Sequence, residues 1–472
     1  MTWDMVIGLE VHMQLRTASK MFCACSTAFG DPPNTNVCPL CLGLPGALPV
    51  VNGHALALAA RAALALGCTV HERSVFARKN YFYPDLPKGY QISQYDKPLA
   101  TDGSVAFDSA GRGRVAVHIQ RLHVEEDAGK SLHDRLPGKT AVDLNRAGVP
   151  LAEIVSGPDL RTPAEARAWL TTLRQILLYS GASDCSMEQG SLRVDANLSV
   201  RRAGATAFGT KTEVKNMNSF ANVERALTAE YARQVELLER GEPVRQVTLL
   251  FDAGSGAVRP MRSKEESHDY RYFPDPDLPP LVLSQEWIDQ QREALPELPE
   301  ARRGRLEAEH GLSAYHASVV SGEPALADYY ESLVAAGVDA RQAANWVTGD
   351  VMTAWNDTGG FPVGAERLAA LITLERDGTV SLQAAKRIFT ELRERDAEPR
   401  DVAAQLGLLQ VRDTDALSGW VDEVIAAHPG EAERYRGGES KLMGFFVGQV
   451  MKRSQGKADP KGVQPLLQER LK

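Results

Sequence analysis

Five segments of the sequence alternate polar and apolar residues with the period of a β-strand, and each puts a carboxylate beside another polar side chain on one face. These groups are Glu10/His12, His123/Glu125, Asp143/Asn145, Arg193/Asp195/Asn197 and Lys211/Glu213/Lys215. One such strand is ordinary, because an antiparallel sheet commonly shows a polar face to water. Five strands that mix acids with Lys, Arg and His favour a single polar concave face able to hold Mg²⁺ and phosphates.

The run Arg121–Lys130 carries the densest charge, with three consecutive acids at Glu125, Glu126 and Asp127. Neighbouring carboxylates repel one another, and their burial costs free energy unless cations or hydrogen-bond donors compensate. Mg²⁺ compensates well, because it binds one or two carboxylates together with substrate phosphates. Taken alone, the run also fits a solvated charged turn.

Four cysteines follow the spacing C-x-C and C-x-x-C, at Cys23, Cys25, Cys38 and Cys41. Each pair lies on a tight turn, and a tetrahedral structural Zn²⁺ takes four thiolates. We therefore expect a zinc-binding insertion at 23–41; the alternative is a set of reduced, buried thiols. The isolated Cys68 and Cys185 are expected in the core.

Length and charge limit the class of protein. The 472 residues suffice for two to four domains, and the net charge of −8 argues against nucleic-acid binding over the whole surface. The segment 441–472 is the exception, with seven Lys/Arg against two Asp/Glu, and such a tail can bind a phosphate backbone. No apolar run reaches the roughly 18 residues of a membrane span, and the start carries no basic leader, so we expect a cytoplasmic protein.

A proline- and tyrosine-rich loop at 78–94 has the composition of a segment that stacks on and hydrogen-bonds a substrate; the alternative is a rigid aromatic turn packed on a sheet. A similar motif recurs near 264–280. Prolines at 274–280, 296 and 299 mark a linker, and helical periodicity follows over 324–336, 340–355, 365–376, 382–396, 416–427 and 442–452. No G-x-x-x-x-G-K-[ST] or G-x-G-x-x-G loop is present between a strand and a helix, so a bound nucleotide is held differently.

Four of these motifs together resemble one family. They are KNYFYPDLPKGYQISQ at 79–94, EEDAGK at 125–130, D-x-NR-x-G-x-PL-x-EI at 143–154 and HDYRYFPDPDLPP at 268–280. The chain resembles the B subunit of the tRNA-dependent amidotransferases, the GatB family, over essentially its whole length. The resemblance implies an α+β fold, with a sheet-rich cradle at 1–290, an all-α helical domain at 291–405 and a small helical tail domain at 406–472.

The resemblance also implies an activity. The family phosphorylates the side-chain carboxylate of Glu-tRNA(Gln) or Asp-tRNA(Asn) with ATP and replaces the phosphate with ammonia. Implied cofactors are ATP, Mg²⁺ and structural Zn²⁺, and implied partners are the GatA glutaminase subunit, the GatC subunit and tRNA(Gln) or tRNA(Asn). No amidase signature occurs here, so we expect the ammonia to come from GatA.

By the same resemblance, the site residues fall into four groups. Mg²⁺ ligands would be Glu10, His12, Glu125 and Glu213. Catalytic contacts would be Glu125, Glu126, Lys79, Lys88 and Arg146. Glu153, Asp195 and Lys215 would contact ATP or its phosphates. Lys441, Lys452, Arg453 and Lys457 would bind tRNA in the tail.

Two alternatives remain at the level of the sequence. One is a zinc-containing RNA-binding scaffold without chemistry, in which the polar face only holds phosphates. The other is a free-standing Mg²⁺ phosphohydrolase or nuclease, which would turn over without a partner subunit. Nothing in the sequence distinguishes Glu-tRNA(Gln) from Asp-tRNA(Asn) as the substrate.

Overall fold

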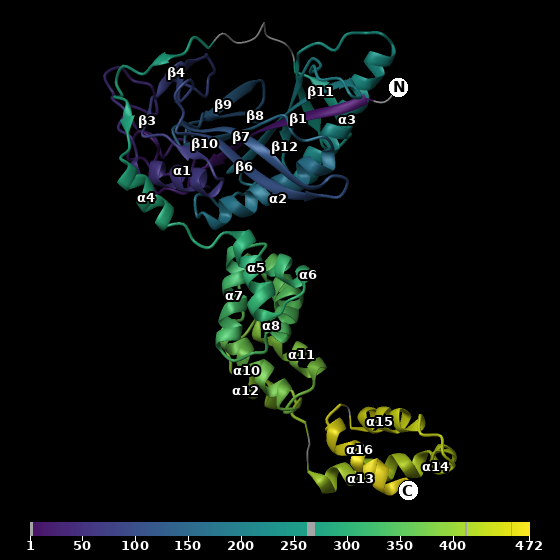
Figure 1. Cartoon of the computed structure of the whole chain (residues 1–472). Coiled ribbons are helices and arrows are strands. Elements are labelled where there is room, and N and C mark those ends of the chain that lie inside the picture. Colours follow the sequence, from purple (N-terminus) through teal and green to yellow (C-terminus); the bar gives the residue numbers. More distant parts are fainter. Residues whose placement is uncertain (1–2, 262–269, 411–412, 455) are drawn as a thin grey trace. The chain divides into compact units, whose positions relative to one another are not determined.

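The computed structural model describes residues 3–261, 270–410, 413–454 and 456–472, and the chain divides into two compact units between Pro299 and Glu300 (Figure 1). The first unit is built on a large sheet with helices, and the second is helical. The α+β prediction is therefore confirmed. None of the described helices combines the length and the apolar character required to cross a membrane.

A nine-stranded sheet forms the centre of the first unit, in the order β14-β13-β12-β11-β1-β10-β7-β6-β2. Its strands in that order are Ala257–Pro260, Thr248–Asp252, Thr212–Met217, Leu192–Arg202, Trp3–Gln14, Pro150–Ser156, Gly113–Glu126, Ala100–Ser109 and Thr69–Val70. All neighbouring strands pair antiparallel except β12 and β13, which run parallel. The long central strands β11, β1, β10 and β7 lie side by side, so their polar faces form one surface.

The two faces of the sheet follow from the alternation of its strands. On β1, Leu9, Val11 and Met13 are no more than 1% exposed, whereas Glu10 and His12 point to the opposite face. Helices α1 (Gly53–Ala65), α2 (Pro163–Tyr179) and α3 (Phe220–Glu239) cover the apolar face (Figure 1). The other face of the central strands is thus left to polar side chains.

Helix α2 begins as its sequence predicts. The hydroxyl of Thr162 accepts a hydrogen bond from the backbone N–H of Glu165 at 3.1 Å, and Pro163 occupies the first turn, where its missing N–H is not needed. Helix α3 is capped in the same way by Ser219. These caps fix where the two covering helices start against the sheet.

Smaller elements border the polar face. A three-stranded sheet has the order β15-β4-β5, with bounds Phe273–Pro274, Ala77–Asn80 and Tyr90–Ser93. Two-stranded sheets pair β16 (Leu281–Val282) with β3 (Arg73–Ser74) and β8 (Lys130–Leu136) with β9 (Lys139–Asp143), and α4 (Gln285–Glu293) ends the unit. The N-terminal part of the predicted 264–280 motif, up to residue 269, lies outside the described residues.

The prediction that Asp143 and Asn145 share the polar face is wrong. Asp143 ends β9, which belongs to a separate hairpin, and both side chains instead accept backbone N–H groups of the cysteine-containing loop. Asn34 N donates to Asp143 Oδ1 at 3.2 Å, and Asn36 N donates to Asn145 Oδ1 at 2.9 Å. The strand ends at Asp143 and Asn145 lies beyond it, so the alternation does not extend to Asn145, and periodicity does not determine which sheet a strand joins.

The second unit contains twelve described α-helices and one π-helical turn. They are α5 (Pro299–His310), α6 (Ala314–Val320), α7 (Pro324–Ala335), α8 (Ala340–Trp346), η1 (Val347–Val351), α9 (Met352–Thr358), α10 (Ala365–Arg376), α11 (Leu382–Leu392), α12 (Pro399–Gln405), α13 (Thr414–Ala427), α14 (Pro429–Arg436), α15 (Leu442–Arg453) and α16 (Pro460–Arg470). Their apolar residues form two separate buried cores, one within 306–403 and one within 417–471.

Candidate active site

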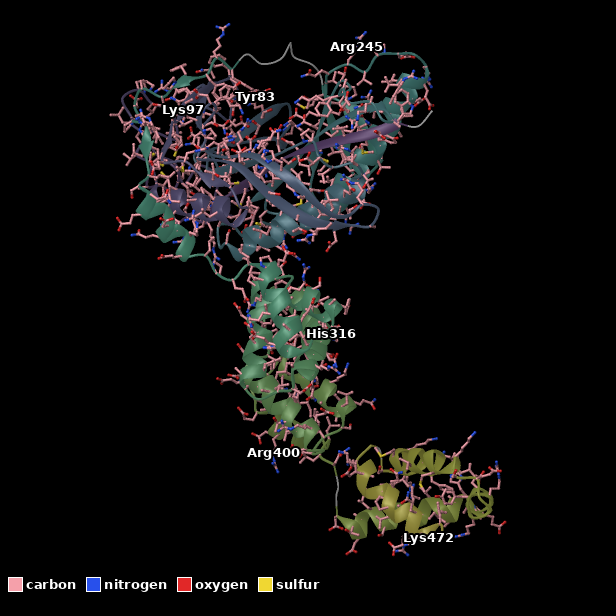
Figure 2. The ribbon with its side chains drawn as sticks, viewed as in Figure 1. Tyr83, Lys97, Arg245, His316, Arg400 and Lys472 are labelled. Atoms are coloured by element: carbon pink, nitrogen blue, oxygen red, sulfur yellow. The ribbon has the colours of Figure 1, made fainter. Side chains whose placement is uncertain are left out.

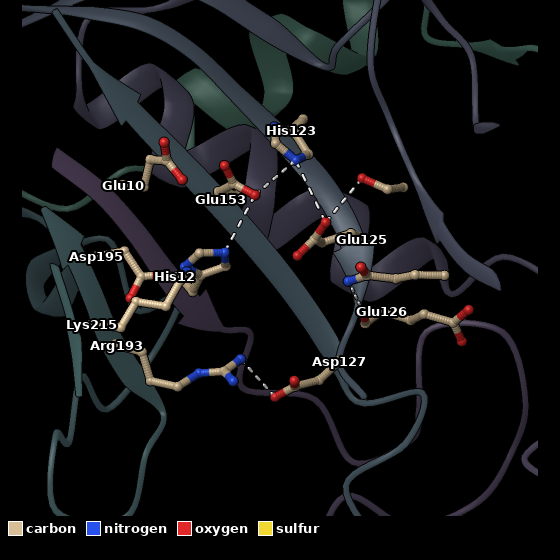
Figure 3. A network of polar contacts seen from close by, with 12 residues as sticks. Glu10, His12, His123, Glu125, Glu126, Asp127, Glu153, Arg193, Asp195 and Lys215 are labelled. Atoms are coloured by element: carbon tan, nitrogen blue, oxygen red, sulfur yellow. Dashed lines mark hydrogen bonds and ion pairs between the residues drawn. The ribbon is translucent and has the colours of Figure 1, made fainter. Parts of the chain in front are cut away.

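The polar face brings His12, Glu125 and Glu153 together, with one ligand atom of each lying within 4.8 Å of the others (Figure 3). Strand register explains the cluster. His12 on β1 pairs with Glu153 on β10, and Glu153 pairs in turn with His123 on β7. Side chains at directly opposed positions share a face, so this row forms as soon as the three strands align.

Glu153 joins the two histidines. Its Oε2 atom lies 3.3 Å from His12 Nε2 and 3.3 Å from His123 Nε2, and His123 Nε2 lies 3.6 Å from Glu125 Oε2 (Figure 3). Ser93 Oγ donates to Glu125 Oε2 at 2.9 Å. The result is a chain of alternating imidazoles and carboxylates, in which His123, Glu125 and Glu153 are buried and His12 is half-buried.

Burial and charge act in opposite directions on these groups. Burial alone would lower the pKa of His123, but the charge of Glu153 and its contact with Glu125 raise it to about 9. Burial would raise the pKa of Glu153, but the charge of His123 and the hydrogen bond with His12 hold it well below its ordinary value. The alternating order of the chain thus favours ionised carboxylates beside protonated imidazoles.

A second charged group lies on strands β11 and β12 of the same face. Lys215 Nζ contacts Asp195 Oδ2 at 2.6 Å and Glu213 Oε1 at 2.9 Å, and Thr248 Oγ1 donates to Glu213 at 2.9 Å. Glu10 lies between the two groups and accepts from Asn197 Nδ2 at 3.0 Å. Burial, followed by the charges of Glu153 and Glu213, raises the pKa of Glu10.

The four Mg²⁺ ligands expected from the sequence therefore lie on one face, but they do not all meet at one point. His12 and Glu125 belong to the compact cluster, whereas Glu10 and Glu213 are not among the three residues whose ligand atoms lie within 4.8 Å. Two carboxylates, with an imidazole that has released its Nε2 proton, are a suitable donor set for a divalent cation such as Mg²⁺ or Mn²⁺. Glu153, expected to contact ATP, is part of this donor set.

The acidic run continues from the cluster into two ion pairs. Lys88 binds Glu126, whose carboxylate also accepts the backbone N–H of Ile92 at 2.9 Å. Arg193 NH2 lies 2.9 Å from Asp127 Oδ2 (Figure 3). The three consecutive acids thus have different partners, so they form no solvated turn.

Lys79 and Arg146 take different positions around the cluster. Lys79 lies on β4, where the charges of Glu125 and Glu153 oppose the effect of burial and raise its pKa. The guanidinium of Arg146 donates to the backbone oxygens of Ala128 at 2.9 Å and Gly129 at 2.6 Å, so it braces the turn after the acidic run. Lys79 is therefore the better placed of the two to face a substrate.

A cavity of about 410 Å³ extends the polar face beyond Glu10. Its lining includes Arg121, Asn197, Phe208 and Lys211. Within the described part of the chain, Arg121 Nε is buried without a hydrogen-bond partner, which is costly unless a ligand accepts from it. The volume lies within the range typical of small-molecule sites.

The four predicted cysteines also come together. Sγ of Cys41 lies 3.7 Å from those of Cys23 and Cys38 and 4.0 Å from that of Cys25. Four thiolates about 2.3 Å from one Zn²⁺ would be separated by similar distances, so the cluster is compatible with zinc. A hydrogen bond with Cys23 lowers the pKa of Cys41 to about 4. Burial acts in the opposite direction, and the charge of Lys20 adds to the lowering.

Lys20 was not expected from the sequence. It is completely buried, and its Nζ donates to the backbone oxygen of Asn36 at 2.7 Å and to Cys41 Sγ at 3.4 Å. An ammonium group in this position offsets thiolate charge. The only signal in the sequence is a lysine three residues before the first cysteine, which is too common to single out.

The tail residues are exposed. Lys441 precedes α15, Lys452 and Arg453 end it, and Lys457 follows it, with Arg453 Nε paired to Glu423 at 2.7 Å. These cations lie within the second unit.

Comparison with known proteins decides the family. Residues 5–289 match the GatB/GatE catalytic domain, and residues 328–471 match the GatB domain. The chain belongs to the GatB family. Over the full length of both chains, it is 51% identical to the B subunit of the aspartyl/glutamyl-tRNA(Asn/Gln) amidotransferase of Geobacter sulfurreducens and 52% identical to that of Moorella thermoacetica. It is 49% identical to the same-named protein of Prosthecochloris aestuarii, over 98% of that protein. In this GatB-family chain, the residues of the polar face all lie in the segment that matches the catalytic domain.

Proposed function

We propose that this protein is the B subunit of a tRNA-dependent amidotransferase and carries the ATP- and Mg²⁺-dependent step. In the first reaction, the γ-phosphoryl group of ATP passes to the side-chain carboxylate of Glu-tRNA(Gln) or Asp-tRNA(Asn), and ADP leaves. In the second, ammonia attacks the acyl phosphate carbon, inorganic phosphate leaves and one proton is lost. The observation that carries the proposal is the buried chain His12, Glu153, His123 and Glu125 beside Lys79.

The donor set suits a metal and a phosphate together. His12, Glu125 and Glu153, with Glu10 and Glu213 further along the same face, would hold Mg²⁺, which when bound would neutralise charge on the transferring phosphoryl group. The 410 Å³ cavity beyond Glu10 has the volume to receive a nucleotide, with Lys211 and Arg121 as phosphate or ribose contacts. Asp195 and Lys215 lie on the same face outside the lining of this cavity, and they would contact the phosphates.

The chain's own residues supply positioning and charge. Lys79, half-buried and under the charge of Glu125, would approach the oxygen of the carboxylate that becomes phosphorylated. Lys88 and Glu126, together with Arg146, would hold the loop next to this point. Such a site works mainly by aligning the phosphoryl donor with its acceptor and by stabilising the charge that develops between them.

The partners follow from the chemistry that this chain lacks. Ammonia would come from the GatA glutaminase subunit, with GatC bracing the pair, and the four cysteines would hold a structural zinc. The exposed cations Lys441, Lys452, Arg453 and Lys457 would bind the tRNA backbone.

The test is an amidation assay with partner subunits, Glu-tRNA(Gln) or Asp-tRNA(Asn), ATP, Mg²⁺ and ammonium, comparing wild type with Glu125→Gln. We expect amidated aminoacyl-tRNA and phosphate release from the wild type, and neither from Glu125→Gln. If both proteins bind tRNA but neither amidates it, the chain is an RNA-binding scaffold. If the chain hydrolyses phosphate esters without partners, it is a phosphohydrolase.

A further inference from the structure

Five tyrosine rings form a connected series on the small sheet β15-β4-β5 and the loops beside it. The ring centroids of Tyr83 and Tyr81 are 5.9 Å apart, those of Tyr81 and Tyr270 are 6.0 Å apart, and those of Tyr270 and Tyr272 are 6.0 Å apart. Tyr272 and Tyr95 stack in parallel, with centroids 4.2 Å apart and planes at 8°. We call these five residues the tyrosine series.

Segments distant in the sequence build this series. Phe273 pairs with Arg78, so the chain after residue 270 runs along β4 as an added strand. The side-chain amide of Asn80 donates to the backbone oxygen of Tyr270 at 3.1 Å, and the Arg78 guanidinium binds Asp275 at 2.9 Å and Asp277 at 2.8 Å. The ring contacts are therefore fixed by backbone pairing and by these ion pairs.

The middle of the series lies beside the candidate active site. Lys79 Nζ lies 4.9 Å from the ring centroid of Tyr270, and the charge of Glu125 acts on this same lysine. Tyr81 Oη donates to Gln91 Oε1 at 3.2 Å, and the Gln91 amide donates to the backbone oxygen of Glu126 at 2.6 Å. The middle of the series thus borders the acidic run.

Both ends of the series are open to solvent. Tyr83 is 52% exposed and Tyr95 is 54% exposed, and neither donates a hydrogen bond through its hydroxyl within the described structure. Figure 2 labels Tyr83 among the side chains of the first unit. A flat ligand that stacks on these exposed rings would remove their apolar faces from water.

On the basis of the proposed function, we propose that the tyrosine series binds the unpaired 3′ end of the aminoacyl-tRNA, with Tyr95 and Tyr83 stacking on its bases. The amino acid is esterified to the terminal ribose, so the terminal base must lie beside the centre whenever the side-chain carboxylate is in it. Every base has a flat π face, and tyrosine rings are common platforms for unpaired nucleotides. Lys79 would lie between the stacked bases and Glu125, beside the aminoacyl end of the RNA.

The test measures amidation by the complete complex with Tyr95→Ala, Tyr95→Phe and Tyr83→Ala. Stacking on one base predicts a rise in KM for aminoacyl-tRNA of about tenfold in each alanine variant, with KM for ATP unchanged. Tyr95→Phe keeps the ring and should behave as wild type. Tyr315→Ala is the matched control, because Tyr315 is 69% exposed but lies in the second unit.

A direct readout uses tRNA whose terminal adenine is replaced by 2-aminopurine, the fluorescence of which falls on stacking. We expect quenching by the wild type and by Tyr315→Ala, and loss of quenching with Tyr95→Ala. Unchanged KM values and unchanged quenching in a folded Tyr95→Ala protein would overturn the inference. Loss of the partner subunits from that variant would also overturn it, because the tyrosine series would then be a protein interface. If the wild type forms no amide at all, the proposed function fails instead.

Discussion

Glu153 is the residue on which the chain of imidazoles and carboxylates in the candidate site depends, because its carboxylate contacts both His12 and His123. Replacing it with Gln keeps the shape but removes the charge that both imidazoles face. We expect Glu153→Gln to lower amidation by about 100-fold or more while tRNA binding stays the same. The control is Glu286→Gln, an exposed acid on α4. Activity of Glu153→Gln close to wild type would remove this residue from the site.

Glu165 shows how a buried carboxylate away from the site links stability to pH. It accepts from Arg112 Nε at 2.6 Å, from Ser109 Oγ at 2.9 Å and from the backbone N–H of Arg161 at 2.8 Å. Burial would raise its pKa, but the bond from Arg112 and the others lower it below the ordinary 4.5. The ionised form is therefore favoured by folding, and its contribution is present above pH 4.5 and is lost as pH falls through the lowered pKa.

The prediction for Glu165→Gln follows from that sign. At pH 7 the free energy of unfolding of the variant should be about 2 kcal/mol lower than that of wild type, because charge-assisted hydrogen bonds are lost. The difference should shrink as the pH is lowered from 5 to 3, as measured by urea unfolding at each pH. A difference that stays constant over this range would show that shape, and not charge, is what Gln fails to supply.

The residue scale also shows what the sequence can predict. Alternation alone puts Glu10 with His12 and His123 with Glu125, because the period of a strand determines which side chains share a face. It cannot pair Glu153 with either histidine, since that contact depends on β10 lying between β1 and β7. Lys20 was missed for the same reason, because its role appears only when the loop 23–41 folds over it.

Among the elements, the cysteine loop is the clearest prediction from spacing alone. If the four thiolates hold zinc, purified protein should contain one equivalent, and Cys41→Ser should contain well below one and unfold at lower temperature. Cys68→Ser, which alters a buried thiol outside the loop, should keep its zinc. Metal analysis and thermal melting of the three proteins check this. Absence of zinc from wild type would leave the buried-thiol alternative.

Two residues after the cysteine loop 23–41, Gly43 packs against the backbone of Pro87 and Lys88. Gly43 has φ +65°, and a Cβ there would lie 2.9 Å from the backbone carbonyl carbon of Pro87 and from the backbone nitrogen of Lys88. We expect Gly43→Ala to lower the free energy of unfolding by about 1–3 kcal/mol and to reduce amidation by displacing Lys88, with zinc content unchanged. Gly46→Ala is the matched control, because its φ is +84° and its Cβ would meet nothing within 4 Å. Equal effects of the two substitutions would show that backbone strain, and not the close approach of the two loops, is responsible.

Helices in the second unit show the limit of periodicity at this scale. The six predicted helices are all present, with ends that shift by a few residues, whereas α5, α6, α12, α14 and α16 were missed. Four of these missed helices begin at a proline, and α16 also contains Pro465. Their sequences therefore resemble a linker more than a helix. Their apolar residues contribute to the two buried cores, and that packing stabilises helices too short to stand alone.

At the scale of the whole molecule, the two units have separate hydrophobic cores, and the predicted chemistry is divided between them. The first unit contains the polar face and the cysteine cluster, and the second contains the basic residues of the tail. Such a division allows the charge of the tail to change affinity for a polyanion without changing the reactive centre.

That separation leads to a prediction about salt. In the triple variant Lys441→Gln, Lys452→Gln and Lys457→Gln, three exposed cations are removed while buried side chains stay in place. We expect weaker tRNA binding, and a plot of log K against log salt whose slope is smaller by about 0.7–0.9 for each phosphate that the variant no longer binds. The value of kcat at saturating tRNA should match wild type, because the polar face of the first unit is unchanged.

The control is Lys386→Gln, which removes an exposed lysine paired with Asp350 on the same unit. A fall in kcat with an unchanged salt slope would instead mean that the tail acts on the reactive centre and does not hold the RNA backbone.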